Sequence, residues 1–277
     1  MNCYATLGMI KSDLSIASAT TTYDTRLFDV LEVASRTVDT WCHRKFFGEL
    51  ATRYFPGSGS PLFLDDLLSI TASSFKLDED GNGTFEVTLA TTDYILCPLN
   101  GFPKTYVKVA PDGDYGGFAA GQPKGVEIAG LWGYGSETDA TPYRLSTTTL
   151  NGDHNASTTS IAVVSGTPFS AGHTILIDSE QMDLTAVSSN TLTVVRGINS
   201  TTAATHSTGA TVYIWEYPRP IIQATLIIAQ RIWKGKDGSY FGPSGAVEIG
   251  QAVEQVAWRE VHRWLPGIDS YIRKRLA

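Results

Sequence analysis

Short β-prone segments separated by turn residues fill the middle of the chain, and they constrain its fold more than any other feature. Between residues 52 and 135, pieces such as Phe85–Thr88, Tyr94–Leu96 and Tyr106–Val109 alternate with Gly, Pro and Asp turns. The links are too short for crossover helices, so the pattern predicts antiparallel hairpins and not a βαβ series. The glycine-rich stretch Pro111–Gly121 is typical of a long loop.

A second β-prone region runs from Ser146 to Tyr217 and differs in composition from the first. Arg196 is its only basic residue, and the region carries most of the chain's excess of threonine. Its strand candidates recur about every ten residues, a spacing typical of a small sandwich or barrel. They are Ser160–Val164, Thr174–Ile177, Met182–Val187, Thr191–Val195 and Val212–Trp215. We interpret this region as an inserted module.

Helical periodicity appears on both sides of the β regions. From Thr20 to Phe46, apolar residues recur at three- and four-residue steps, with acid at the start and base at the end, which suits the helix dipole. The same period returns from Ile221 to Trp233, behind two prolines, and again from Val247 to Trp264. These helices flank the sheet and are expected to pack together on one side of it.

The predicted fold class is therefore α+β. It has a helical core, made of a long N-terminal helix plus C-terminal helices, with an antiparallel hairpin-rich β region and a separate small all-β sandwich or barrel insert. The predicted domains are a core with a C-terminal docking tail, residues 1–145 and 218–277, and the inserted all-β module, residues 146–217.

Composition and charge argue against several function classes. The 277 residues carry a formal net charge of -7 and include no apolar run long enough to span a membrane. The N-terminus lacks the flank and apolar stretch of a signal peptide, and the three cysteines share no CxxC spacing, so we expect a reducing compartment. The acidic balance argues against tight DNA binding, because neutralising phosphates requires a dense Lys/Arg surface.

The sharpest local motif, Asp78–Glu86, matches the first half of a calcium-binding loop. Oxygen ligands stand at its first, third and fifth positions and glycine at the sixth. The twelfth position, where a bidentate carboxylate belongs, is Leu89, and the flanks are β-prone. Asp-Gly and Asn-Gly pairs also favour hairpin turns. We therefore predict a turn here and not a metal site.

No other pattern predicts catalysis, metal binding or a cofactor. The five histidines lack the HExxH spacing, and neither Gly57–Ser60 nor Gly242–Gly245 fits a nucleophile elbow or a phosphate-binding loop. Asp178 and Glu180 would share one face of a strand, as paired carboxylates sometimes do in glycosidases, but an exposed acidic strand face is the commoner explanation. We expect no enzyme activity, with no catalytic, cofactor-binding or metal-binding residues.

Three further stretches, none diagnostic alone, follow one another in an informative order. The helix Asp29–Phe46 ends in a Cys-x-Arg-x-Phe sequence, Val126–Gly135 is a strand closing on Trp-Gly-Tyr, and Pro220–Lys234 is a second helix. In this order they resemble the ring-forming head-to-tail connector (adaptor) proteins of tailed bacteriophages. The family normally joins Trp-Gly-Tyr to the second helix by a short link. Here the module 146–217 occupies that link, and its strands resemble modules of other phage structural proteins.

The resemblance implies a structural virion protein. Such proteins form a homo-oligomeric ring, commonly of twelve subunits, under the portal protein in the neck between capsid and tail. The implied partners are further copies of the chain, the portal, and tail or neck proteins. Genomic DNA would pass through the channel without sequence-specific binding, no membrane would be involved, and assembly would take place in the host cytoplasm.

Two segments are candidates for contacts in such a ring. The basic C-terminal tail is expected to dock on the portal, although a solvated helix end explains its charge equally well. Its candidate residues are Ile268, Tyr271, Ile272, Arg273, Lys274 and Arg275. The glycine-rich loop is expected to face the lumen or the tail. Its candidate residues are Asp112, Asp114, Tyr115 and Phe118.

Two alternative functions stay open at this point. The first is a tail or baseplate-type adhesion protein whose β module binds carbohydrate through exposed Thr and Asn residues. The second is a glycosidase that uses Asp178 and Glu180. The first predicts that residues 146–217 bind sugar, and the second predicts an activity that is lost when either acid is neutralised.

Overall fold

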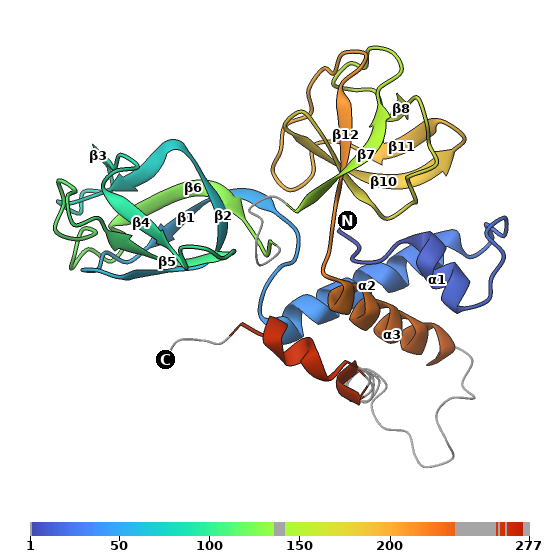
Figure 1. Ribbon diagram of the computed structural model, residues 1–277, viewed down its shortest axis with the longest axis horizontal. Helices are drawn as coiled ribbons and strands as arrows, with labels where there is room; N and C mark the ends of the chain where they lie inside the picture. Colours follow the sequence, from blue (N-terminus) through green and yellow to red (C-terminus); the bar gives the residue numbers. More distant parts are fainter. Residues whose placement is uncertain (1, 136–141, 236–258, 260, 264, 274–277) are drawn as a thin grey trace. The chain divides into compact units, whose positions relative to one another are not determined.

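The computed structural model describes residues 2–135, 142–235, 259, 261–263 and 265–273. The chain divides into two compact units, each described here by itself (Figure 1). The helix–β unit contains Met1–Arg44 and Tyr143–Ala277, and the β unit contains Lys45–Pro142. Strands make up 34% of the chain and helices 22%, so the protein is mostly β.

The predicted helical core with a long N-terminal helix is therefore wrong. The helix α2 spans Asp24–Cys42 and not residues 20–46, because a turn precedes it and His43, with a left-handed φ of 52°, ends it. Each sheet has an apolar core of its own, because its strands alternately bury every second side chain. Most of the predicted helix 247–264 lies outside the described residues.

The β unit is an antiparallel sheet organised around one long, bent strand. Its strands are β1 (Glu49–Phe55), β2 (Leu62–Leu77), β3 (Val87–Thr88), β4 (Tyr94–Cys97), β5 (Lys104–Val109) and β6 (Val126–Trp132). Their order is β1-β6-β2-β5-β4, with β3 also paired to β2. Register shifts in β2 bend it, so that its first half pairs with β5 and its second half with β6.

The core of the β unit also takes in the glycine-rich loop between β5 and β6. Phe118, in that loop, is buried and stacks on Phe75 of β2 with ring centroids 5.6 Å apart. Its backbone exchanges two hydrogen bonds of 2.8 Å with Ser58, which fixes the loop on the sheet. The prediction that Phe118 faces a lumen or a tail conflicts with this position, because an aromatic ring of this size gains more from burial in the core.

The helix–β unit contains a second antiparallel sheet, which we call the module barrel. Its strands are β7 (Tyr143–Thr149), β8 (Ser160–Ala162), β9 (Thr174–Ile177), β10 (Glu180–Ser188), β11 (Thr191–Val195) and β12 (Thr211–Trp215), in the order β7-β12-β9-β10-β11-β8. Beyond the ladder, Val164 N donates to Thr149 O and Asn151 N to Ala162 O. These bonds join the two edge strands and close the sheet.

Within this unit the module barrel is tied to helices by the first residues of the chain. The helices are α1 (Leu7–Asp13), α2, α3 (Arg219–Gly235) and the short 3-10 helix η1 (Pro266–Tyr271). Tyr4 N donates to Ser35 Oγ on α2, and the Tyr4 ring packs on Tyr217 after β12, with centroids 4.7 Å apart. No helix in the described part of the chain is long and apolar enough to cross a membrane. The domain boundaries proposed from the sequence stay a prediction.

Replacing Phe118 tests whether the glycine-rich loop is part of the core. We expect Phe118→Ala to lower the free energy of unfolding by about 3–5 kcal/mol, because it leaves a cavity beside Phe75. The exposed neighbour Asp112→Ala should change it by less than about 0.5 kcal/mol. Urea denaturation of the two variants measures both values, and equal effects would contradict the assignment.

Candidate functional site

Part of the C-terminal tail packs against the rest of the helix–β unit. Ile268 is fully buried, and the backbone N of Arg273 donates to Cys42 O at the end of α2 over 2.8 Å. Tyr271 and Ile272 are half-buried. The candidate tail residues outside the described part of the chain are Lys274 and Arg275. Ile268 thus has a structural role, and portal docking by the tail stays a prediction.

The glycine-rich loop divides its candidate residues between core and solvent. Tyr115 packs against the apolar cluster that also contains Phe118. Asp112 and Asp114 are exposed, so they are the loop residues that a partner could reach. The contact of this loop with a lumen or a tail stays a prediction for those two carboxylates.

The hairpin predicted at Asp78–Glu86 is confirmed, since β2 pairs with β3 across it. Asp78, Asp80 and Glu86 place one oxygen each within 4.8 Å of one another. The carboxylate of Asp78 is already used, because it accepts bonds from Gly81 N (2.7 Å) and Gly83 N (2.9 Å). These bonds explain the cluster as turn geometry.

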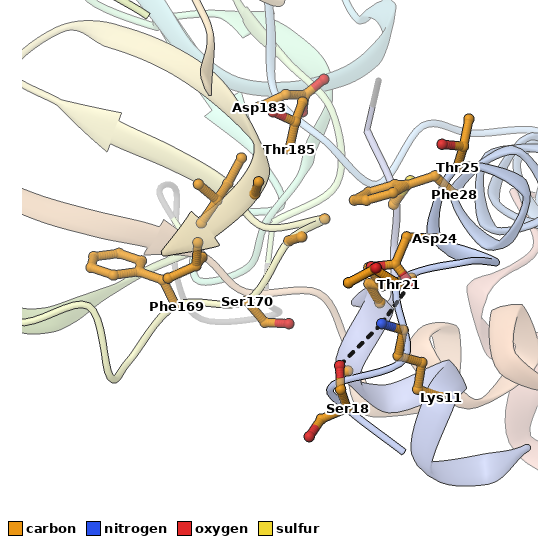
Figure 2. A pocket seen from close by; sticks show the side chains of 18 of the residues that line it. Lys11, Ser18, Thr21, Asp24, Thr25, Phe28, Phe169, Ser170, Asp183 and Thr185 are labelled. Carbon is orange, nitrogen blue, oxygen red and sulfur yellow. Dashed lines mark hydrogen bonds and ion pairs between the residues drawn. The ribbon is translucent and has the colours of Figure 1, made fainter. Parts of the chain in front are cut away.

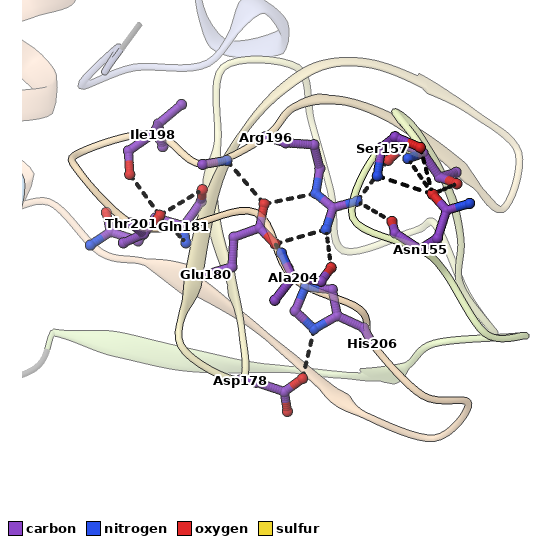
Figure 3. Close-up of polar contacts among 12 residues, drawn as sticks. Asn155, Ser157, Asp178, Glu180, Gln181, Arg196, Ile198, Thr201, Ala204 and His206 are labelled. Carbon is purple, nitrogen blue, oxygen red and sulfur yellow. Dashed lines mark hydrogen bonds and ion pairs between the residues drawn. The ribbon is translucent and has the colours of Figure 1, made fainter.

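The module barrel encloses a charged cluster that the sequence pattern did not reveal (Figure 3). Glu180 at the start of β10 is fully buried, so the expected exposed acidic strand face is wrong for this residue. Arg196 Nε and Nη2 donate to its two carboxylate oxygens, each over 2.7 Å. Gly197 N and Ala204 N each donate over 2.9 Å, and His206 Nε2 lies 2.9 Å away.

These donors determine the charge of Glu180. Burial alone would raise the pKa of this carboxyl, but the hydrogen bonds from Arg196, from the backbone and from His206 outweigh it and hold the pKa at about 2. A glycosidase acid needs a raised pKa and a free path for its proton. The geometry therefore gives Glu180 a structural role and argues against the dyad with Asp178, which instead contacts His206 Nδ1 over 2.6 Å.

Arg196 uses every N–H of its guanidinium in this cluster. Besides the two bonds to Glu180, Nη1 donates to Asn155 O (2.9 Å) and Thr158 O (2.8 Å), and Nη2 to Ala204 O (2.6 Å). One side chain thus holds together β10 and two loops of the barrel. The sequence did carry a signal for it, because a single arginine in a long segment without other basic residues is a candidate for a buried partner of an acid.

A pocket of about 650 Å³ lies in the helix–β unit, lined by α1, α2 and the module barrel (Figure 2). Leu7, Phe28, Phe169 and Val187 make part of its lining apolar. Lys11 also lines it, but its ammonium group is paired with Asp24 over 2.5 Å and donates to Ser18 O over 3.3 Å. The pocket is thus largely apolar, and the charge of Lys11 is already paired with Asp24.

Asp29 gives this pocket one exposed acidic group, whereas Asp183 is buried, and burial raises the pKa of its carboxyl. Asp29 and Asp183 line it together with the Lys11–Asp24 pair. Burial raises the pKa of the Cys3 thiol to about 12, so this cysteine is no nucleophile at neutral pH. The described lining therefore favours the binding of an apolar or basic group over a chemical reaction.

Both units carry exposed apolar side chains that the sequence did not predict. Leu99 is 68% exposed and Phe63 is 52% exposed. In the module barrel, Leu145 and Val195 are 53% and 50% exposed. Alternation along a strand could have indicated such faces, but it does not tell which of the two faces is buried.

Comparisons with known proteins identify no relative of this chain. No family model, no curated protein and no solved structure matches the chain. The head-to-tail connector resemblance accordingly rests on the order of sequence stretches alone.

Removing the cation of the buried cluster should destabilise the module barrel strongly. We expect Arg196→Gln to cost about 3–5 kcal/mol of unfolding free energy, because Glu180 is left buried and charged without its partner. The matched control is Arg144→Gln, which breaks the exposed Arg144–Glu216 pair and should cost less than about 1 kcal/mol. Hydrogen exchange of the barrel amides measures both, and equal losses would contradict the structural role.

The cluster should also make the module barrel sensitive to acid. Because the folded pKa of Glu180 is depressed from 4.5 to about 2, its contribution is complete above pH 4.5 and is lost as the pH falls toward 2. Glu180→Gln should be less stable at neutral pH and lose less stability between pH 4.5 and 2. Thermal unfolding at a series of pH values checks this, with Arg144→Gln expected to keep the steeper wild-type dependence.

Proposed function

We propose that this protein is a structural virion component, a head-to-tail connector that forms a homo-oligomeric ring under the portal and joins the capsid to the tail. In this role it extends the DNA channel and contacts the portal on one side and tail or neck proteins on the other. It acts in the virion neck after assembly in the host cytoplasm, and it does so without catalysis or a cofactor.

The observation that carries this proposal is the exposure of large apolar side chains on both units. Phe63, Leu99, Leu145 and Val195 each leave half or more of their surface in solvent. Exposed apolar side chains favour contact with other chains, because burying them at an interface gains the hydrophobic free energy that the fold leaves unused. A subunit of a permanent assembly is the class of protein that this surface fits best.

The polar residues support the same class. Glu180 and Arg196 saturate each other in the interior of the module barrel, and Asp78 accepts bonds from its own turn. The pKa of the Cys3 thiol is raised by burial. Glu180 and Asp78, the acids first considered for chemistry, are thus engaged in the fold, which leaves assembly as the better-supported activity.

The proposed position of the ring, under the portal, comes from the three stretches that resemble the connector family. In the structure they fall on α2, on β6 with the residues that follow it, and on α3. α2 and α3 pack against each other within the helix–β unit. The sequence order and this pairing are the grounds for placing the ring at the portal and not elsewhere in a virion.

Electron microscopy of the purified protein, with and without portal protein, tests the proposal. We expect annular particles, because exposed apolar surfaces on every copy favour closed association. Dispersed monomers in both samples would overturn it. Substituting Lys274→Gln and Arg275→Gln together tests the docking tail without disturbing the buried Ile268, and unchanged portal binding would remove the tail from the proposal.

A further inference from the structure

Exposed and partly exposed apolar side chains lie on β2, on β5 and in the loop after β4 of the β unit. Phe63 on β2 lies directly opposite Tyr106 on β5, and Tyr106 lies opposite Cys97 at the end of β4. Side chains that face each other in this way share one side of the sheet. The ring centroids of Phe63 and Tyr106 are 6.1 Å apart. Leu99 lies in the loop that follows β4, where its carbonyl oxygen accepts a hydrogen bond from Lys104 of β5. We call Phe63, Leu99 and Tyr106 the knob.

The loop that carries Leu99 is held in place by a buried cation. The side chain of Lys104 is almost fully buried and donates to Pro98 O over 2.6 Å and to Leu99 O over 3.0 Å. Its ammonium group also lies 4.2 Å from the centre of the Phe102 ring. The exposed Leu99 is thus presented by an ordered loop, and a group that is already ordered loses less entropy when it binds.

The pocket of Figure 2 has the complementary character. Its volume of about 650 Å³ is within the range that holds several side chains, and Leu7, Phe28 and Val187 offer apolar contacts. Asp29 adds an exposed acidic group to this lining. An apolar group that arrives together with a cation therefore fits the pocket better than an anion or a neutral polar molecule.

A cation of this kind, Lys108, lies beside the knob. Lys108 is exposed, stands two residues after Tyr106 on the same side of β5, and has its ammonium group 5.7 Å from the Tyr106 ring centre. Opposite charges across an interface favour one orientation and speed the encounter. Apolar contact and charge thus point to the same pairing of the two surfaces.

We propose that the knob of one copy of this chain docks in the Lys11–Asp24 pocket of the next copy. The inference rests on the proposed ring and identifies the contact that builds it. The knob belongs to the β unit and the pocket to the helix–β unit, so the contact joins two different surfaces of the chain. Contacts of this heterologous kind repeat from copy to copy and close into rings when the rotation permits.

Two complementary variants test this pairing. Leu99→Ser removes the apolar tip of the knob, and Ala186→Trp fills the pocket from an exposed lining position on β10. We expect each variant alone to raise the protein concentration needed for assembly about tenfold or more, because buried apolar area is lost or blocked. Light scattering coupled to size-exclusion chromatography measures this, and circular dichroism checks that each variant is folded.

Mixing the two variants gives the decisive result. The Ala186→Trp chain keeps its knob and the Leu99→Ser chain keeps its pocket, so an equal mixture should form dimers with one intact contact and stop there. A mixture that stays monomeric overturns the pairing. As a matched control, Val164→Ser removes another exposed apolar side chain of the module barrel, one that does not line the pocket, and should leave assembly unchanged.

The same experiment separates this inference from the proposed function. If the wild-type chain forms rings and Leu99→Ser forms them at the same concentration, the knob is not the contact, while the connector proposal stands. Loss of assembly in Val164→Ser but not in Leu99→Ser places the contact at Val164 and also overturns the inference. A wild-type chain that stays monomeric at every concentration, with and without portal, overturns both.

Discussion

The pair formed by Glu180 and Arg196 is the interaction on which the organisation of the helix–β unit depends. Its first effect is local, because the two side chains together fix the start of β10 and the loops around Asn155 and Ala204. A carboxylate and a guanidinium lose much hydration when they are buried, and only a nearly complete set of hydrogen bonds offsets that loss. The barrel supplies that set, so the charges specify one arrangement of its loops.

The influence of the pair extends from the barrel to the helices through one loop. Gly197, bonded to Glu180, leads to Asn199, whose amide donates to Gln181 Oε1 over 2.7 Å and to Asn2 Oδ1 over 3.1 Å. Asn2 O in turn accepts from Arg36 on α2 over 3.0 Å. The N-terminal segment thus connects the barrel to the helix that lines the pocket, so the shape of the pocket depends on the buried pair.

The sequence predicted the strands and the helix at Ile221–Trp233 well and the helical core poorly, for a physical reason. Thr174–Ile177 and Thr191–Val195 are strands with the expected bounds, since alternating residues between turn signals define a strand locally. The bounds of α2 depended on the backbone of His43, which a periodicity does not reveal. The prediction of a helical core was wrong because strand pairing between distant residues decides where apolar residues are buried. Here β2 pairs with both β5 and β6.

The candidate site was less accessible from sequence than the strands, because it is made by residues distant in the chain. The knob combines residues of β2, β5 and the loop after β4, and the pocket combines α1, α2 and the barrel.

The net charge of the chain was an equally limited guide to function. The net charge of -7 counts buried and exposed groups alike, among them the buried pair of Glu180 and Arg196, so it does not tell which charges lie on the surface that DNA or another subunit meets. What such a partner meets is the exposed charge, such as Lys108 on the knob and Asp29 in the pocket, and its placement beside apolar side chains favours protein contact over nucleic-acid binding.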